Sequence, residues 1–159
     1  MPQDNQTRTT KLIASNRRLR HDFEILQKLE AGIVLLGTEV KSLRAGQCNI
    51  KDAYAYFPNA NNDELYIINM HIPPYKHGNI NNHDPLRKRK LLVKHREAVK
   101  LRTAIQEKGL TIMPYSLYFS GRYVKVELCI VRAKKKYDKR ESIKERDTEI
   151  NIRRDFRFR

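Results

Sequence analysis

Positively charged side chains gather in three segments of this sequence, and groups of this kind bind phosphate. The last segment begins at Arg132, and Lys or Arg recurs from there to the end of the chain. Near the N-terminus, Arg17 and Arg18 stand close to His21. The middle segment is a run of four cations, Arg87, Lys88, Arg89 and Lys90. Guanidinium and ammonium groups neutralise phosphate oxygens, so these segments predict contact with a polyanion.

The charge of the whole chain supports this prediction. Its 159 residues include 33 Lys and Arg against 18 Asp and Glu, which gives a formal net charge of +15. A domain this basic has the electrostatic character of a nucleic-acid-binding protein, and a soluble basic protein with no such partner is the alternative. The length fits one domain with a tail.

Residue types that could carry out catalysis or hold a metal are scattered. The five histidines include no pair at metal-binding spacing, and His77, His83 and Asp84 fit ordinary polar loop residues better than metal ligands. No phosphate-cradling glycine loop, nucleophile elbow or paired-carboxylate motif occurs. A nuclease would need several acids around a metal. We therefore predict no enzyme, no catalytic residue, no metal, no cofactor and no small-molecule substrate.

Cysteine usage and hydropathy bear on the compartment. Cys48 and Cys129 lack metal-ligand spacing, and two thiols without a secretory segment are typical of reduced core residues in a cytoplasmic protein. No apolar run approaches the roughly 18 residues that a membrane span requires. We expect a cytoplasmic protein without a membrane partner.

One acid and several tyrosines add to the binding hypothesis. Glu30 precedes Ala31 and Gly32 in an apolar segment, where glycine permits a bulge. Its carboxylate could accept hydrogen bonds from an exposed base or pair with a neighbouring arginine, and both possibilities stay open. The tyrosines that could stack on bases, or serve as half-buried structure, are Tyr54, Tyr56, Tyr66 and Tyr75.

The elements that must position these side chains are mostly short strands. Alternating apolar residues between glycine and proline turns predict strands, and the period of 3.6 residues with a glycine stop predicts helices. We expect a helical turn after Ser15, strands over 23–36, 50–57, 64–72 and 91–93, a long polar loop over 73–85, and helices over 38–44 and 94–108. A final hairpin joins strands 110–119 and 122–131.

This order of elements predicts a mainly β fold. The expected architecture is a small antiparallel β-barrel of the oligonucleotide-binding type, with about six strands, flanking helices and a basic tail. Residues 133–159 offer too little apolar surface to offset the entropy of ordering, so we expect this tail to be disordered when free. The predicted organisation is a disordered N-terminus over 1–12, a barrel over 13–132 and the tail over 133–159.

Several motifs resemble the SsrA-binding protein (small protein B) family. They occur in consistent order from about Ile13 to about Arg146. They read NRRLRHDF at 16–23, EAGI at 30–33, GTEVKSLRAG at 37–46, HDP at 83–85, RKLL at 89–92 and YDKR at 137–140.

The resemblance implies a fold, partners and a process. It implies an oligonucleotide-binding-type barrel that binds the tRNA-like domain of transfer-messenger RNA and enters the vacant A site of a stalled bacterial ribosome in trans-translation. The tail would then lie in the empty mRNA channel. The family's RNA contacts carry over to Asn16, His21, Glu30, Leu92 and the segment around Arg87 to Lys90. Tail functions carry over to Lys134, Lys135, Tyr137, Asp138, Lys139 and Arg140, and the basic tail continues through Ile143, Lys144 and Arg146.

Two positions depart from the family pattern. Ala133 replaces a frequent glycine, which would cost roughly 1 kcal/mol if a left-handed conformation were required there. Tyr137 replaces a frequent histidine, so stacking on a base survives but no group titrates near neutral pH. The alternative to the family's function is a generic barrel-type RNA chaperone or ribosome-associated RNA-binding protein.

Overall fold

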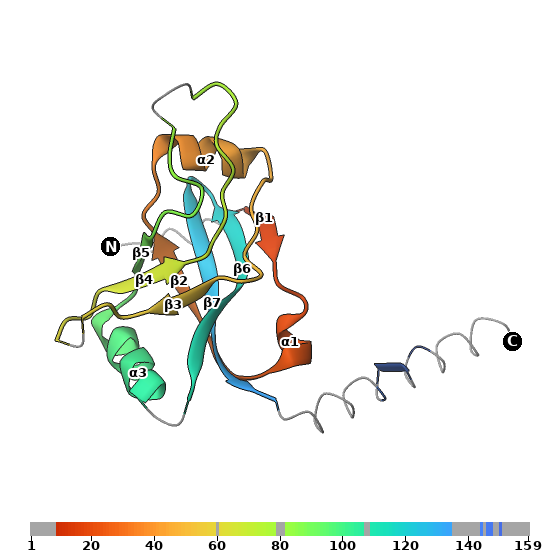
Figure 1. The fold of residues 1–159 in the computed structure, drawn as a ribbon, viewed down its shortest axis with the longest axis vertical. Helices are drawn as coiled ribbons and strands as arrows, with labels where there is room; N and C mark the ends of the chain where they lie inside the picture. Colours follow the sequence, from red (N-terminus) through yellow and green to blue (C-terminus); the bar gives the residue numbers. More distant parts are fainter. Residues whose placement is uncertain are drawn as a thin grey trace, which may run out of the picture.

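The computed structural model describes residues 9–59, 61–78, 82–106 and 109–134, together with 144, 146, 147 and 150. Seven strands and three helices are assigned within this described part (Figure 1). The strands are β1 Thr10–Ser15, β2 Phe23–Ile33, β3 Tyr54–Tyr56, β4 Leu65–Ile68, β5 Arg89–Leu92, β6 Thr111–Ser120 and β7 Tyr123–Ala133. The helices are α1 Leu19–Asp22, α2 Gly37–Arg44 and α3 His95–Gln106.

Six of the strands close a barrel, and the seventh extends its wall. The strand order is β1-β6-β3-β4-β5-β2-β7, and β6 also pairs with β7, so the last six strands of this order form a ring. All pairings are antiparallel. The expected antiparallel barrel of about six strands is confirmed for the ring, and β1 is an additional strand beside β6.

The extra strand corrects the expected N-terminal boundary. The prediction that residues 1–12 are disordered is wrong for Thr10–Leu12, because these residues begin β1 and pair with Ser120, Phe119 and Tyr118 of β6. The strand is weakly apolar, and its Leu12 side chain is 58% exposed. Main-chain pairing with a long neighbour stabilises β1, and hydropathy does not report such pairing.

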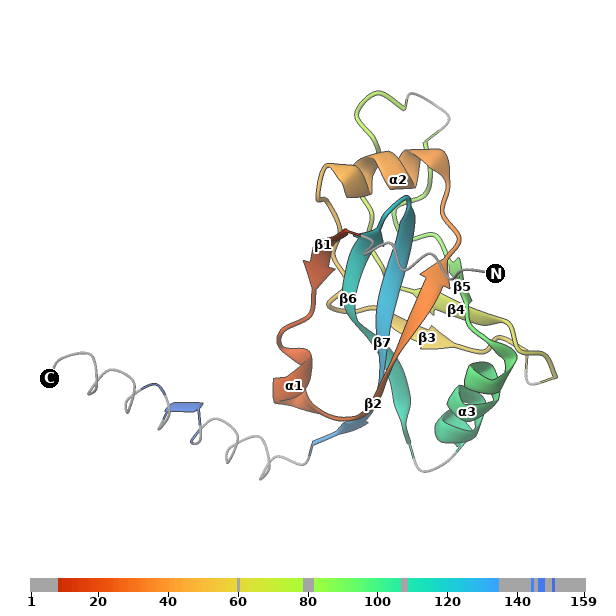
Figure 2. The ribbon, with the colours of Figure 1, turned by 180° about the vertical axis from the view of Figure 1, so that it is seen from behind.

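The hairpin of β6 and β7 forms the back of the barrel (Figure 2). Gly121 at its turn has φ of +61°, a conformation that costs glycine little. Along β7, buried Val124, Val126 and Leu128 alternate with partly exposed residues, as predicted. Beyond Leu128 the alternation stops, because Cys129 is also buried and packs in a second small core. Helix α1 supplies Leu19 to that core, and so covers the outer face of the strand.

Strand β2 pairs with both β5 and β7 and is shorter than expected. The predicted interruption near Glu30 is wrong, because the register shift lies between Ile25 and Gln27. The strand also ends at Ile33 rather than at residue 36. Gly32 has another purpose, since a Cβ atom there would lie 3.3 Å from the Cβ of Leu92. The glycine allows β2 and β5 to approach each other closely.

Two helices cover the two ends of the barrel, as Figures 1 and 2 show. Helix α2 is followed by Gly46 with φ of +76°, and α3 is followed by Gly109 with φ of +68°, which confirms both predicted glycine stops. Helix α3 buries Ala98 and Leu101 against the barrel. The predicted helical turn after Ser15 is displaced, because α1 begins only at Leu19.

Strands β3 and β4 are shorter than their sequence patterns predicted, and β5 begins two residues earlier and ends one residue earlier than the expected 91–93. Their inward residues nevertheless build the main core, in which Leu65, Ile67 and Leu91 are almost completely buried. Cys48 and Cys129 are both free cysteines, and burial raises the pKa of Cys48 to about 12 and that of Cys129 to about 11. Both thiols therefore stay protonated near neutral pH. No helix in the described part of the chain is long and apolar enough to cross a membrane.

Candidate nucleic-acid interface

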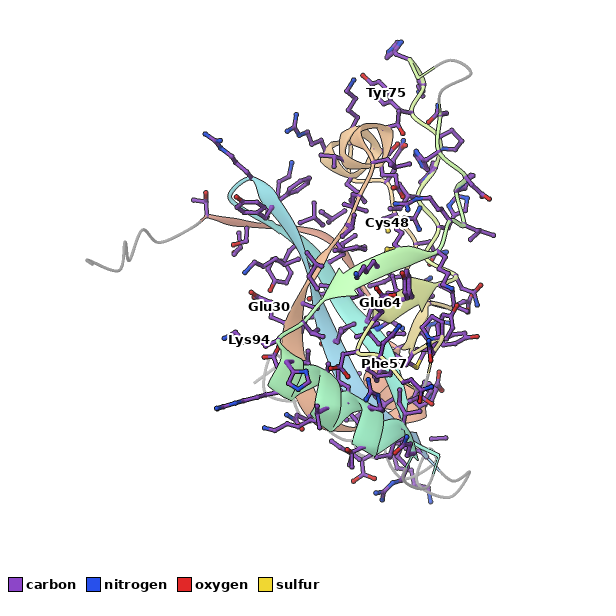
Figure 3. All side chains as sticks on the ribbon, turned by 90° about the vertical axis from the view of Figure 1, so that its left-hand side faces the viewer. Glu30, Cys48, Phe57, Glu64, Tyr75 and Lys94 are labelled. Carbon is purple, nitrogen blue, oxygen red and sulfur yellow. The ribbon has the colours of Figure 1, made fainter. Side chains whose placement is uncertain are left out.

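An open cleft of about 570 Å³ lies where β2, β7, the end of β5 and the start of α3 meet. Figure 3 labels two of its lining residues, Glu30 on β2 and Lys94 just before α3. The charged or apolar side chains that line it include Lys28, Glu30, Leu92, Lys94, Lys100 and Lys125. Residues from four separate parts of the chain therefore share one basic surface, which we call the cleft.

Glu30 is held between two donors on the outer face of the sheet. The Tyr118 hydroxyl donates a hydrogen bond to one carboxylate oxygen, and the Lys125 ammonium lies 2.6 Å from the other. Tyr118 and Lys125 are direct cross-strand partners on β6 and β7. Burial, the hydrogen bond to Glu30 and the nearby negative charges raise the pKa of Tyr118, so its hydroxyl stays a donor. The sequence alternative named a neighbouring arginine as the partner of Glu30, and the structure places Lys125 there instead.

Some lysines of the cleft form salt bridges and others do not. Lys28 pairs with Glu127 at 3.6 Å, and Lys125 pairs with Glu30. Lys94 and Lys100, in contrast, form no salt bridge with any residue that the structure describes. Ammonium groups without a salt-bridge partner are suited to phosphate oxygens, although the Glu97 carboxylate also lines the cleft and accepts a hydrogen bond from the Lys94 main-chain N–H.

Leu92 adds an apolar surface to this charged cleft. Its side chain is 53% exposed and packs over Gly32. A large exposed leucine beside lysines can contact the face of a base or a ribose, while the lysines bind phosphate. The cleft therefore combines a carboxylate acceptor, an apolar contact and cations, the groups with which proteins recognise unpaired RNA nucleotides.

The N-terminal basic patch adjoins the cleft. Arg17 and Arg18 are exposed just before α1, and Asn16 and Arg18 line a second, smaller hollow. Asn16 itself is only 5% exposed, and its main-chain N–H and C=O bond to Tyr115 and Leu19. It therefore positions α1, and a direct RNA contact by Asn16 stays a prediction, as does a contact by the half-buried His21.

One tyrosine connects the two basic surfaces. The Lys28 ammonium lies 4.4 Å from the centre of the Tyr115 ring, and the Arg20 guanidinium lies 5.4 Å from it. Lys28 also lines the cleft, so positive charge continues from α1 across β6 to β2. An extended polyanion can contact both surfaces at once.

The cationic run from Arg87 to Lys90 does not act as one surface. The prediction that Arg89 faces phosphate is wrong, because its side chain is completely buried and paired with Glu39. Arg89 also donates a hydrogen bond to the Met70 carbonyl at 2.7 Å. Arg87 lies 2.5 Å from the same Glu39 carboxylate. Two of the four cations therefore hold the barrel to α2 and the loop before β5.

Glu39 is the centre of this buried ionic cluster. Burial alone would raise its pKa, but hydrogen bonds from the Leu36 N–H and from Arg87 and Arg89 together lower the pKa below the usual 4.5. The Leu36 N–H bond, 2.9 Å long, also caps the first turn of α2. We call Glu39, Arg87 and Arg89 the buried cluster.

The other two cations of the run lie on the surface, among tyrosines. The Lys88 ammonium is 4.7 Å from the centre of the Tyr66 ring and 5.3 Å from that of Tyr56. Lys90 pairs with Glu64 at 3.4 Å. The tyrosines thus have structural partners within the protein, and stacking on bases stays a prediction.

The described part of the polar loop at 73–85 is held to α2 by hydrogen bonds. The His83 ring bonds to the Thr38 hydroxyl at 2.9 Å and to the Ile72 carbonyl at 2.8 Å. The Ser42 hydroxyl donates to the Pro73 carbonyl at 2.7 Å. His83 therefore has a structural role, and no group of three metal-binding side chains occurs among the described residues.

Most of the tail falls outside the described residues. Lys135, Tyr137, Asp138, Lys139, Arg140 and Ile143 belong to that part. Strand β7 continues to Ala133, which pairs with Phe23, and the Lys134 N–H donates to the Asp22 carbonyl at 3.2 Å. Lys144 and Arg146 are described as exposed. The role of the tail stays a prediction.

Sequence reasoning missed several residues of the cleft, namely Tyr118, Lys28, Lys94, Lys100 and Lys125. The alternation of β7 places Lys125 on an outer face, but periodicity says nothing about the neighbouring strand. Only the order in which β2, β7 and β6 pair brings Lys125 and Tyr118 to Glu30. For Lys94 and Lys100, no signal beyond charge was present in the sequence.

The closed ring of antiparallel strands and its basic cleft define a small β-barrel of the oligonucleotide-binding type. Residues 13–158 match the SmpB protein family, so the match covers almost the whole chain. The chain belongs to this family.

Relatives of known name cover nearly the same length. The chain is 50% identical to the SsrA-binding protein of Carboxydothermus hydrogenoformans over 149 residues, which is 94% of this chain and 98% of that protein. It is 52% identical to the SsrA-binding protein of Magnetococcus marinus over 87% of this chain and 91% of that one.

A solved structure agrees in fold as well as in sequence. It is described as "tmRNA-SmpB: a journey to the center of the bacterial ribosome" and superposes with a TM-score of 0.64 and 46% identity. The match covers 82% of this chain and 93% of the other.

Proposed function

We propose that this protein binds the tRNA-like domain of transfer-messenger RNA and delivers it to the A site of stalled ribosomes for trans-translation. Membership of the SmpB protein family and relatives named SsrA-binding protein support this function. So does the likeness to a chain from a tmRNA-SmpB structure. The protein acts as a cytoplasmic RNA-binding adaptor and not as an enzyme.

The cleft is the observation that carries the proposal. A uniformly basic surface would bind any phosphate backbone, whereas Glu30 places a carboxylate among the lysines. A carboxylate repels phosphate and accepts hydrogen bonds from base amino groups or a ribose hydroxyl. This arrangement favours an RNA that presents an unpaired nucleotide at a fixed distance from its backbone.

Each cleft residue then has a separate task. Lys94 and Lys100 contact phosphates, and Leu92 packs against a base or a ribose. Glu30 accepts hydrogen bonds from the nucleotide, while Tyr118 and Lys125 fix the direction of its carboxylate. The α1 side extends the contact through Asn16, Arg17, Arg18 and His21, and Lys88 and Lys90 contribute surface charge nearby.

The tail has a different task in this proposal. Residues from Lys134 onward occupy the empty mRNA channel of the ribosome, with Tyr137 stacking and Lys135, Lys139 and Arg140 binding ribosomal RNA phosphates. A charged segment with few apolar residues orders only on a partner of opposite charge, which suits such a channel.

A competition experiment tests the proposal. The protein is bound to labelled tRNA-like domain, and total tRNA or unlabelled tRNA-like domain is added at fixed salt. We expect the tRNA-like domain to compete far better than tRNA. Equal competition would instead indicate a generic RNA chaperone of the same barrel type.

The division of labour between barrel and tail has its own test. A chain that ends at Lys134 keeps the whole of β7, and we expect it to bind transfer-messenger RNA nearly as tightly as the full protein. It should fail to support tagging of incomplete peptides on stalled ribosomes. Normal tagging by the shortened chain would exclude the tail's role.

A further inference from the structure

A separate basic hollow lies near α2, apart from both the cleft and the small hollow beside α1. It has a volume of about 280 Å³ and is formed by the start of β1, the end of α2 and the turn between β6 and β7. Figure 2 shows β1 and the tips of β6 and β7 beneath α2. Lys11, Arg44 and Arg122 line it, and Phe119 contributes an aromatic wall.

The three cations of this hollow, like Lys94 and Lys100 of the cleft, have no carboxylate partner among the described residues. Lys28, Arg87, Lys90, Arg102 and Lys125 each pair with a carboxylate within 4 Å. Lys11, Arg44 and Arg122 form no salt bridge and no side-chain hydrogen bond with any described residue.

The hollow is also free of negative charge along its described lining, which contains no Asp or Glu. Three cations from three distant parts of the sequence therefore converge with no internal counter-ion. Like charges that converge repel one another, and a bound anion would remove that repulsion. The arrangement has the character of an anion site rather than of a stabilising ionic network.

The chemistry of the hollow favours one class of anion. Two arginines offer planar pairs of donors that fit phosphate oxygens, and Lys11 adds a third cation. The exposed Arg44 and Arg122 leave the hollow open to a long ligand, and Phe119 offers a surface against which a ribose can pack. A phosphodiester backbone satisfies all three features.

The hollow is distinct from the cleft. Lys125 of the cleft lies three residues along the chain from Arg122, which corresponds to about 10 Å of extended strand. We propose that Lys11, Arg44 and Arg122 form a second phosphate site that holds the phosphodiester backbone of RNA. The proposal rests on the function proposed above, and it adds a contact that neither the cleft nor the tail provides.

Salt dependence measures this contact directly. A variant with both Arg44→Gln and Arg122→Gln is compared with a matched control that carries Lys76→Gln and Arg96→Gln. The control loses the same charge from exposed positions outside both sites. Each lost phosphate contact lowers the slope of log affinity against log salt by about 0.7 to 0.9. We expect the slope to fall by about 1 to 2 in the variant and to stay unchanged in the control.

The phosphodiester backbone could belong to transfer-messenger RNA or to ribosomal RNA, and two arms of the experiment distinguish these two RNAs. One arm measures binding to the isolated tRNA-like domain, and the other measures association of the preformed RNA complex with stalled ribosomes. A fall in slope in the first arm assigns the site to transfer-messenger RNA, and a fall only in the second assigns it to ribosomal RNA. Equal slopes for variant and control in both arms would overturn the proposal.

Two further measurements keep the result unambiguous. Arg44→Lys combined with Arg122→Lys retains both charges and should retain the slope, and thermal unfolding shows whether each variant keeps the fold. The preference of the wild-type protein for the tRNA-like domain over tRNA is recorded in the first arm. Loss of that preference counts against the function proposed above, whereas equal slopes count against the second site alone.

Discussion

Two of the glutamates of the barrel, Glu39 and Glu30, are each held by two side-chain donors but have different roles. Glu39 lies between Arg87 and Arg89 and is completely buried, whereas Glu30 lies between Tyr118 and Lys125 and keeps about half of its side chain exposed. The first group joins α2 to the loop before β5, and the second lines an open cleft. Burial, rather than the residue types, separates a stabilising cluster from a binding surface.

The difference has an energetic cause. Charges that are buried away from water must be compensated by partners inside the protein. Loss of one partner leaves the other charge buried and unpaired, which lowers the free energy of unfolding strongly. Charges at a surface cleft keep their water until a ligand replaces it, so their loss changes binding more than stability. Each of the following experiments tests one side of this contrast.

The largest effect is expected in the buried cluster. Arg89→Met removes the completely buried partner of Glu39 and should lower the free energy of unfolding by about 3 to 5 kcal/mol. Urea denaturation measures this loss. Lys90→Met is the matched control, because its pair with Glu64 is exposed and contributes about 1 kcal/mol or less. Equal losses of unfolding free energy in the two variants would contradict the distinction between the buried cluster and exposed ion pairs.

A smaller effect, on binding alone, is expected at Glu30. Glu30→Ala should weaken binding of the tRNA-like domain about tenfold, or about 1.4 kcal/mol, with little change in the thermal unfolding temperature. The direction is informative, because removing a negative charge would strengthen purely electrostatic binding to RNA.

Glu24→Ala is the control for this experiment, since Glu24 lies on the same strand but outside the cleft and pairs with Arg132. We expect Glu24→Ala to bind RNA at least as tightly as the wild-type protein. A collapse of the fold in Glu30→Ala, seen by circular dichroism, would assign Glu30 to the stabilising class instead.

A weaker effect is expected at Tyr118. Tyr118→Phe removes one hydrogen bond to Glu30 and leaves the ring, so affinity for the tRNA-like domain should fall about fivefold, or about 1 kcal/mol. Tyr123→Phe serves as the control, because Tyr123 is 65% exposed on the same hairpin. Combined with Glu30→Ala, Tyr118→Phe should add almost nothing, since both act through one carboxylate. Fully additive losses would show that Tyr118 acts independently.

The smallest effect is expected in the pH dependence of the unfolding free energy that arises from the ionisation of Glu39. Its pKa is lowered in the folded protein, so the stability that it contributes is present above its unfolded value near 4.5 and is lost as the pH falls through the folded pKa. The difference in unfolding free energy between the wild-type protein and Glu39→Gln should be constant above about pH 5.5 and should narrow below pH 4.5. A difference that does not vary with pH would exclude a paired carboxylate.

The sequence by itself determined much of the architecture. The glycine stops after α2 and α3 and the hairpin turn at Gly121 appear as local patterns and are confirmed, and the alternation of β7 is confirmed as far as Leu128. Local patterns succeed here because a period of two residues or a left-handed glycine is a property of the chain itself. Strand β1 was missed because its stability comes from main-chain pairing with β6, and no apolar pattern records it.

Only the tertiary structure decided what each charge does. Within one run of four cations, Arg89 is buried against Glu39 while Lys88 stays among surface tyrosines, although the sequence treats them alike. Glu30 could be placed near positive charge, but Lys125 and Tyr118 became its partners only through the pairing of β2, β7 and β6. The role of a charged group depends on burial and on the nearest opposite charge, and both arise from contacts between residues far apart in the chain.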